Sequence, residues 1–127
     1  MQKKLIISPT KGTFGINFDP ARNVFEITGN SFPPNALEFY EPIIEWVEGF
    51  LAGGVSEPIL IKFRVNYYNT SSSKYIYKIL ELFNEHNKNT GNVKLQWYSY
   101  DEDDDLYDDW ESLIQDLDLP YEFISLE

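Results

Sequence analysis

One stretch of the chain concentrates side chains that could bind or carry a phosphate. Four consecutive hydroxyl residues, Thr70-Ser71-Ser72-Ser73, stand between Asn69 and Lys74, where a strand pattern ends and a helix pattern begins. The first N–H groups of a helix and its dipole favour an anion. Each hydroxyl could also accept a phosphate, which would add about −1.5 to −2 charges there. A plain helix cap is the alternative interpretation, although one serine or threonine is enough for that role.

A second stretch, Asp101-Glu102-Asp103-Asp104-Asp105, could bind a divalent cation. Its first, third and fifth residues have the first spacings of a calcium-binding EF-hand loop. Leu106 stands where that loop needs glycine, however, and Ser112 stands where it needs glutamate. A solvated acidic loop before a helix, where negative charge is stabilising, fits the residues better. We therefore predict no metal site.

The composition excludes most catalytic chemistry. The chain has no cysteine, so a disulfide, a thiolate metal site and a thiol nucleophile are all excluded. His86 is the only histidine, and the glycines form neither a P-loop nor a dinucleotide-binding fingerprint. We predict no catalytic residue, no cofactor and no enzyme. The alternative, a magnesium-dependent hydrolase acting through the acidic run, would lose turnover in Asp103→Asn and Asp105→Asn.

The net charge of −11 is unevenly distributed along the 127 residues. Residues 1–100 hold 9 acidic and all 10 basic residues, and residues 101–127 hold the other 12 acidic residues. Nucleic acid and anionic membrane surfaces are excluded as partners because both require a basic face. The apolar runs are shorter than the roughly 18 residues of a membrane span. The run near the amino terminus is also shorter than the about 7–15 apolar residues of a signal peptide, so we expect a cytoplasmic protein.

A small α/β fold must position these side chains. Alternating apolar residues predict strands, and apolar residues three or four positions apart predict helices. The clearest strand is 59–67, whose apolar residues from Ile59 to Tyr67 alternate and bury one face. The order β-β-α-β-α-β-α-β predicts a two-layer α/β sandwich in a single domain, 1–127, with a mixed, mainly parallel sheet and helices on one face. Expected strands are 13–18, 24–28, 59–67, 93–100 and 121–126; expected helices are 36–51, a segment from the hydroxyl string to Lys88, and 106–117, with 29–35 as a loop.

The aromatic residues extend this interpretation. Trp46, Trp97 and Trp110 fall on predicted buried stripes, which places them in the core. Tyr98 and Tyr100 fall on the opposite face of their strand, where they could support a weak dimer. We therefore expect a monomer or a weak dimer.

Four segments carry a resemblance to a known family. The most specific is the Asn-Thr-Ser-Ser-Ser-Lys string after a strand, with Phe-Tyr-x-Pro-x-x-x-Trp at a suitable distance before it. Together they resemble the SiaC-type family of regulatory phosphoproteins, which are bacterial single-domain proteins with a fold similar to STAS domains and anti-anti-sigma factors. The segments are Gly29-Asn30-Ser31-Phe32-Pro33, Phe39-Tyr40-Glu41-Pro42-Ile43-Ile44-Glu45-Trp46, Tyr68-Asn69-Thr70-Ser71-Ser72-Ser73-Lys74 and Val93 to Tyr98.

The resemblance implies a phosphorylation switch at Thr70. In that family a serine/threonine protein kinase phosphorylates the threonine of the string, and a metal-dependent serine/threonine phosphatase removes the phosphate. The unphosphorylated form binds an output protein, a diguanylate cyclase in the best-known system, which links the family to cyclic-di-GMP and biofilm formation. Carried over, the resemblance places partner contacts at Asn69, Ser71, Ser72, Ser73 and Lys74. Tyr67-Tyr68 stands where the family more often has Tyr-Phe.

A sensor of a small ligand or nucleotide is the alternative function. It would use the same helix start as an anion site, without a kinase or an output protein. A thermal-shift assay separates the two, because a sensor gains stability when its ligand exceeds the dissociation constant.

Overall fold

The computed structural model describes residues 3–99 and 104–125. Within these ranges six strands form one sheet whose spatial order is the order of the chain, and three helices connect them. The strands are β1 (Leu5–Ile7), β2 (Gly15–Asp19), β3 (Val24–Ser31), β4 (Ile59–Tyr68), β5 (Val93–Ser99) and β6 (Tyr121–Ser125), and the helices are α1 (Ala36–Ala52), α2 (Thr70–Thr90) and α3 (Asp104–Ile114).

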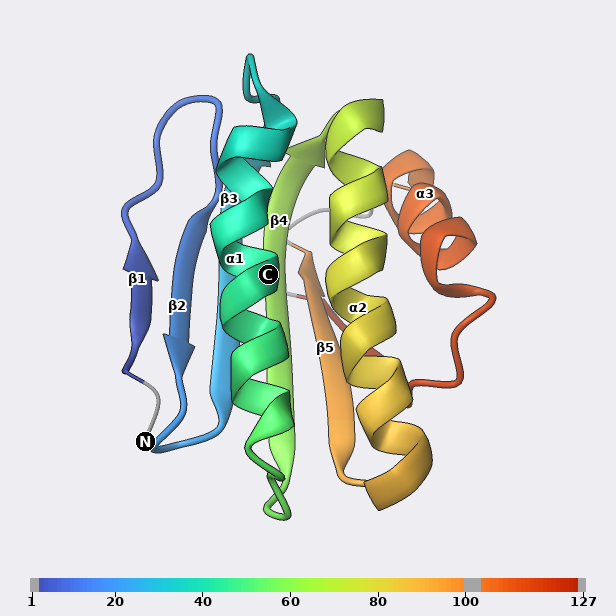
Figure 1. Ribbon diagram of the computed structural model, residues 1–127. Coiled ribbons are helices and arrows are strands. Elements are labelled where there is room, and N and C mark those ends of the chain that lie inside the picture. Colours follow the sequence, from blue (N-terminus) through green and yellow to red (C-terminus); the bar gives the residue numbers. More distant parts are fainter. Residues whose placement is uncertain (1–2, 100–103, 126–127) are drawn as a thin grey trace.

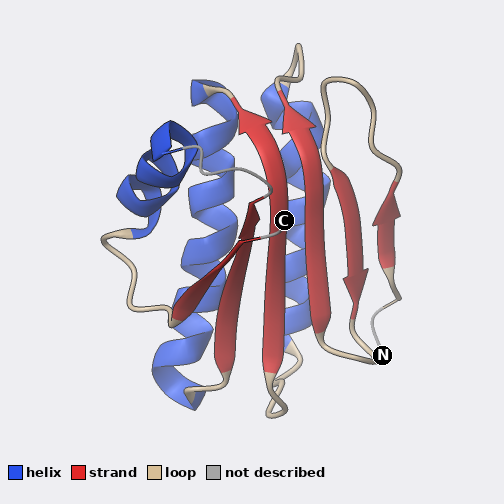
Figure 2. Cartoon of the chain, turned by 180° about the vertical axis from the view of Figure 1, so that it is seen from behind, coloured by secondary structure: helices blue, strands red, loops and turns tan. Residues whose placement is uncertain are grey.

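The sheet is mixed and mainly parallel, as predicted. The pairs β1–β2 and β2–β3 are antiparallel, whereas β3–β4, β4–β5 and β5–β6 are parallel. All three helices lie over one face of the sheet (Figure 1), and the view from behind shows the other face without a covering helix (Figure 2). Each parallel connection crosses on the same side because the strand order advances in one direction. The predicted two-layer sandwich is confirmed.

The core lies between the sheet and the helices and is rich in aromatic rings. Phe25 of β3 lies at its centre, with ring centroids 5.2 Å from Phe18, 5.0 Å from Phe50 and 5.5 Å from Phe83. These rings come from two strands and two helices, so one cluster ties β2 and β3 to both α1 and α2. Edge-on and tilted pairs of this kind add about 0.5–1.5 kcal/mol each beyond their buried area.

Two element predictions are wrong. The actual order begins with three strands, because Leu5–Ile7 pairs with β2 as strand β1. A three-residue apolar run is too short to show an alternating pattern. It is recognised as a strand only by its pairing with β2. The strand expected to end at Thr28 continues to Ser31 and replaces the start of the expected loop. Positive φ at Gly29 suits glycine there, and the parallel ladder with β4 resumes beyond a register shift between Gly29 and Asn30.

The register shift between Gly29 and Asn30 also explains why Tyr67 is exposed. The alternation in β4 predicts that Tyr67 continues the buried row of Ile59 and Val65. Across the register shift, however, Gly29 pairs with Val65 and Asn30 with Tyr67, so the row ends at Val65. Tyr67 is 50% exposed instead of buried. The bulge therefore turns an aromatic ring outward at the carboxyl end of β4.

The tryptophans divide into two kinds. Trp97 and Trp110 are buried as expected, with ring centroids 4.4 Å apart. Trp46 is only partly buried at the surface of the core, and its indole N–H donates to the carbonyl of Lys3 at 2.9 Å. The prediction that all three lie inside the core is therefore wrong for Trp46. Its hydrogen bond to Lys3 holds the segment before β1 against α1.

Candidate functional site

The hydroxyl string lies at the beginning of α2, at the carboxyl end of β4 (Figure 1). Asn69 is the N-cap, and its side-chain oxygen accepts from the backbone N–H of Ser72 at 2.9 Å. Thr70 is the first helical residue and is exposed, as are Ser71 and Lys74. The first N–H groups of a helix have no intrahelical acceptor, so the Thr70 side chain stands where an added anion is stabilised.

Ser72 differs from its neighbours because it is completely buried. Its hydroxyl lies 2.7 Å from the hydroxyl of Ser31 and donates to the carbonyl of Ser31 at 3.1 Å. The hydroxyl of Ser31 also bonds to that of Tyr40 from α1. We call Ser31, Tyr40 and Ser72 the hydroxyl cluster. If Tyr40 donates to Ser31, Ser31 to Ser72 and Ser72 to the Ser31 carbonyl, every proton in the cluster has an acceptor.

The hydroxyl cluster explains why three of the resembling segments belong together. Residues 29–33, 39–46 and 68–74 each supply one of its members, and the backbone N–H of Asn69 also donates to the Ser31 carbonyl at 2.9 Å. Burial raises the pKa of Tyr40, while its bonds with Ser31 and Ser72 act in the opposite direction. The phenol therefore stays protonated and able to donate. The cluster fixes the backbone that carries Thr70.

The burial of Ser72 contradicts the expectation that this residue contacts a partner. A side chain with 0% exposure cannot touch a partner or a kinase while the helix start keeps this structure. In the sequence the four hydroxyl residues look equivalent, but in the structure they differ in burial. Ser73 is half-buried, with its hydroxyl donating to the Thr70 carbonyl at 2.7 Å, which leaves Thr70 and Ser71 as the exposed ones.

Substitution of Ser72 is expected to destabilise the protein, and substitution of Ser71 is not. Ser72→Ala leaves the buried Ser31 hydroxyl without one of its partners, which should lower the free energy of unfolding by about 1–3 kcal/mol. Ser71→Ala is the matched control, one residue away but exposed, and should change it by less than about 0.5 kcal/mol. Urea unfolding measures both. Equal stability of the two variants would show that the hydroxyl cluster contributes nothing.

A pocket of about 340 Å³ lies between the start of α2 and α3. On one wall is Tyr68, whose hydroxyl is buried and has no hydrogen-bond partner among the described residues. The other wall includes the carboxylate of Asp109, an exposed residue of α3. Burial, and after it the negative charge of Asp109, raises the pKa of Tyr68 to about 12. The lining residues are Tyr68, Asn69, Thr70, Ser73, Asp109, Ser112 and Leu113.

The raised pKa of Tyr68 predicts a loss of stability in alkali. An unfolded tyrosine ionises at about pH 10. As the pH rises from there towards 12, the unfolded chain loses a proton that the folded protein keeps, so the free energy of unfolding falls. Two pKa units correspond to about 2.7 kcal/mol, which partial exposure should reduce to about 1–2 kcal/mol.

Denaturant unfolding of Tyr68→Phe against pH measures this contribution. The variant should lose less stability than the unmodified protein between those two pKa values. Tyr121→Phe removes a hydroxyl from a residue that is 42% exposed and should follow the unmodified protein. Identical alkaline slopes in all three would contradict the assignment.

The other sequence predictions concern residues outside the hydroxyl string. Asp101–Asp103 and Tyr100 fall outside the described residues, and Asp104 and Asp105 begin α3 without described side chains. Among the described side chains, no group of three or more could hold a metal ion. Tyr98 is half-buried, donates to Gln96 at 2.7 Å and lies under the guanidinium of Arg64. The weak dimer stays a prediction.

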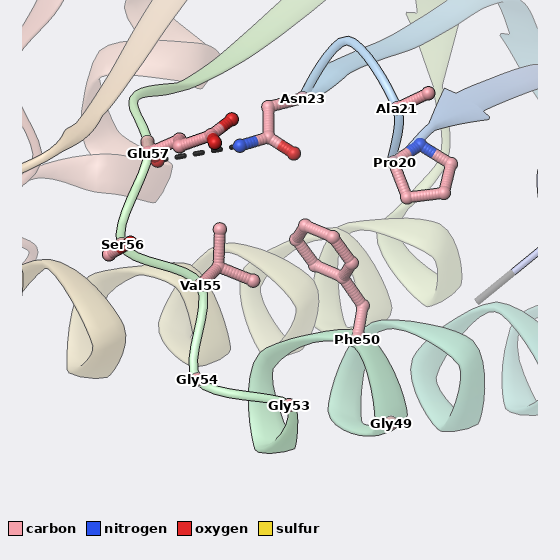
Figure 3. A pocket seen from close by; sticks show the side chains of 10 residues that line it. All are labelled: Pro20, Ala21, Asn23, Gly49, Phe50, Gly53, Gly54, Val55, Ser56 and Glu57. Carbon is pink, nitrogen blue, oxygen red and sulfur yellow. Dashed lines mark hydrogen bonds between the residues drawn. The ribbon is translucent and has the colours of Figure 1, made fainter. Parts of the chain in front are cut away.

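A larger pocket, of about 780 Å³, lies at the opposite edge of the sheet (Figure 3). It is formed where the turn after β2 faces the end of α1, and the side-chain amide of Asn23 donates to the carbonyl of Glu57 at 3.4 Å. Of its described lining residues, three are glycines and only Asn23, Ser56 and Glu57 have polar side chains. Its lining residues are Pro20, Ala21, Asn23, Gly49, Phe50, Gly53, Gly54, Val55, Ser56 and Glu57.

Sequence reasoning missed several residues around Thr70. Ser31 and Tyr40 were recognised only as parts of motifs, and their partnership with Ser72 spans 41 and 32 positions, which periodicity cannot detect. Phe32 and Tyr67 form an exposed aromatic pair, with ring centroids 6.2 Å apart, at the same edge of the sheet. A single exposed aromatic residue is normal on a protein surface, so no local sequence signal marks this pair. None of the helices in the described ranges is both long and apolar enough to span a membrane.

Known proteins are similar to this chain in sequence and fold. Residues 7–126 match the model of the SiaC family regulatory phosphoprotein. An uncharacterised protein of Pseudomonas aeruginosa (strain UCBPP-PA14) is 36% identical over 94 residues, which are 74% of each chain. The crystal structure of apo-SiaC from Pseudomonas aeruginosa is 31% identical, with 95% of this chain and 98% of that chain covered and a TM-score of 0.86.

A second solved structure bears on function. It is the complex of the diguanylate cyclase SiaD with its activator SiaC from Pseudomonas aeruginosa, and its matching chain is 30% identical. The match covers 95% of this chain and 98% of that one, with a TM-score of 0.88. The prediction of a regulatory protein instead of an enzyme is confirmed, as is the resemblance. On the match over residues 7–126, this chain belongs to the SiaC family of regulatory phosphoproteins.

Proposed function

We propose that this protein is a phosphorylation switch in a bacterial partner-switching pathway. A serine/threonine protein kinase phosphorylates Thr70, and a metal-dependent serine/threonine phosphatase reverses the modification in the cytoplasm. The unphosphorylated form binds and activates an output protein, a diguanylate cyclase. The observation that carries the proposal is the exposure of Thr70 on a helix start that the buried hydroxyl cluster holds in place.

Electrostatics supports a switch at this position. A phosphate adds about −1.5 to −2 charges at pH 7 and three acceptor oxygens that need hydrogen-bond donors. The helix start satisfies part of that demand, so the modification leaves the fold intact. A partner surface that packs over neutral Thr70 must instead desolvate a dianion, and each 1.4 kcal/mol of that cost lowers affinity by about tenfold.

The shape of the edge around Thr70 supports a protein partner. Phe32 is 44% exposed and Tyr67 is 50% exposed, and both lie at the carboxyl ends of the strands that precede α1 and α2. Exposed aromatic residues are enriched where proteins bind one another. The complex of SiaD with SiaC supports a diguanylate cyclase as the class of output protein. Tyr67 precedes Thr70 by three residues, at the end of β4 and just before the start of α2.

Mass spectrometry tests the proposal. Protein isolated from its native host with phosphatases inhibited is analysed by intact mass and peptide mapping. We expect one phosphate, on Thr70. A phosphate on Ser71 or Ser73 would move the switch to that residue, and no phosphate under several growth conditions would overturn the proposal.

The pocket beside Thr70 supports a second candidate, a sensor of a small ligand or nucleotide. Its volume of about 340 Å³ falls within the range of about 300–1,000 Å³ that ligand sites occupy. A sensor should gain several degrees of thermal stability with nucleotides or cyclic dinucleotides in excess. No shift with any of them would leave the phosphorylation switch as the better account.

A further inference from the structure

The pocket of about 780 Å³ at the end of α1 has no part in the proposed switch at Thr70 (Figure 3). It lies at the opposite edge of the sheet, where the loop 53–58 leads into β4. Its volume falls within the range of about 300–1,000 Å³ that small-molecule sites occupy. None of its described lining residues is basic, whereas Glu57 contributes a carboxylate. The charge of the lining side chains therefore favours a cation over an anion.

Asn23 supplies the pocket with a buried hydrogen-bond acceptor. The residue is only 6% exposed, and its side-chain N–H donates to the carbonyl of Glu57 at 3.4 Å. Its side-chain oxygen accepts no hydrogen bond from the residues that the structure describes. Figure 3 shows this oxygen directed away from Glu57, towards the space between Pro20 and Phe50. An amide oxygen on so buried a residue needs a donor, and that donor has to come from the pocket.

The carboxyl end of α1 adds negative partial charge to the same pocket. The last carbonyl groups of a helix have no intrahelical donor, and the helix dipole places about half a negative charge there. Basic residues often interact with this end of a helix, but the last turn of α1 contains none. Arg22, in the turn that faces α1, is exposed and does not line the pocket. A metal ion fits less well, because Glu57 is the only carboxylate among the described lining residues.

Apolar side chains form the rest of the wall, and the loop after α1 is held in place. Phe50 packs on Phe25 of the core, with ring centroids 5.0 Å apart, and lines the pocket together with Val55. The carbonyl of Glu57 accepts from the side chain of Asn92 at 3.0 Å as well as from Asn23. The walls therefore exist before a ligand binds, which lowers the ordering cost of binding.

We propose that this pocket binds an organic cation that carries its N–H donors on an aliphatic chain, with the cation donating to the Asn23 side-chain oxygen and the Glu57 carboxylate and with the chain against Phe50. Such a cation supplies the donor that Asn23 lacks, through hydrogen bonds that are about twice as strong as neutral ones. A free amine or guanidine compound and a lysine or arginine side chain of another protein share this chemistry. The site does not depend on phosphorylation of Thr70.

Amide NMR of the full chain, with n-butylguanidinium as the probe, tests the proposal. At constant ionic strength, we expect saturable shifts of the amides of 21–23 and 49–57, with a dissociation constant in the millimolar range that suits so small a ligand. n-Butylurea has nearly the same shape without the charge and should cause no saturable shift. Equal shifts with both compounds, or no saturable shift at these amides, would overturn the proposal.

Two variants test the two acceptors. Asn23→Gly removes the acceptor oxygen and should weaken binding by about tenfold, and Glu57→Gln should weaken it by about twofold to fivefold because the carboxylate is exposed. Glycine suits the φ of 53° at Asn23, and Glu57→Gln changes a surface residue, so both variants should fold. Glu41→Gln is the matched control, since Glu41 is exposed on α1 eight residues before Gly49. Equal affinity in all three variants would overturn the proposal.

A capped peptide, acetyl-Ala-Arg-Ala-amide, distinguishes the two sources of the cation. Binding at least as tight as that of n-butylguanidinium, at the same amides, would support an arginine or lysine side chain of another protein. Weaker binding of the peptide would support a free small molecule, because the added backbone then does not fit the pocket.

Discussion

Thr70→Asp is expected to weaken binding to the output diguanylate cyclase by about tenfold to a hundredfold, and Thr70→Ala is expected to preserve it. The aspartate places a fixed charge where the partner packs over a neutral side chain, and its desolvation should cost about 1.4–2.8 kcal/mol. Alanine removes the phosphate acceptor without adding charge. Isothermal titration calorimetry with the purified cyclase measures both affinities.

Ser56→Asp is the matched control for this prediction. Ser56 is exposed at the opposite edge of the sheet, so the substitution adds the same charge away from the helix start. If net charge alone drives the effect, Ser56→Asp and Thr70→Asp will weaken binding equally, and the switch cannot be assigned to Thr70. Unchanged affinity in Thr70→Asp would contradict the proposed mechanism directly.

The fold was predictable where a pattern is local and long. The alternation from Ile59 to Val65 and the helical stripes of α1 and α2 each extend over several residues, and their elements form where expected. β1 was missed because three residues carry no period, and it exists through pairing with β2. The extension of β3 and the outward turn of Tyr67 come from one register shift, which a two-residue period cannot represent.

The site was predictable in location but not in internal arrangement. A polar string between a strand and a helix pattern correctly identified the N-cap region, and Asn69 is the cap. Whether a given hydroxyl faces solvent or the core depends on partners from other elements. Ser72 is buried because Ser31 and Tyr40 approach it, and no local feature of four adjacent hydroxyls distinguishes it from Thr70.

The position of α3 beside the site depends on its buried side chains, Trp110 and Ile114, of which Trp110 is the larger. Trp110 is 1% exposed, with ring centroids 4.4 Å from Trp97 and 5.0 Å from Phe63. It thereby fixes to the sheet the helix that supplies Asp109 and one wall of the pocket. After α3, the backbone N–H of Asp118 donates to the side chain of Asn84 at 3.1 Å, which is a polar contact with α2.

Trp110→Ala should therefore lower the free energy of unfolding by about 3–5 kcal/mol, the range for removing a large buried aromatic side chain. The loss should be concentrated in α3, because the central aromatic cluster around Phe25 does not include Trp110. Hydrogen exchange should show the amides of 104–114 exchanging much faster while those of β3 and β4 stay protected.

Trp110→Phe is the control, since it keeps a ring against Trp97 and should cost about 1–2 kcal/mol. The two variants also show whether modification of Thr70 at the start of α2 requires a folded α3. If α3 unfolds alone, Thr70 keeps its cap and its hydroxyl cluster, so a kinase can still modify it. Uniform loss of protection through α3, β3 and β4 would mean instead that α3 and the sheet unfold together, and that Trp110 stabilises the whole protein.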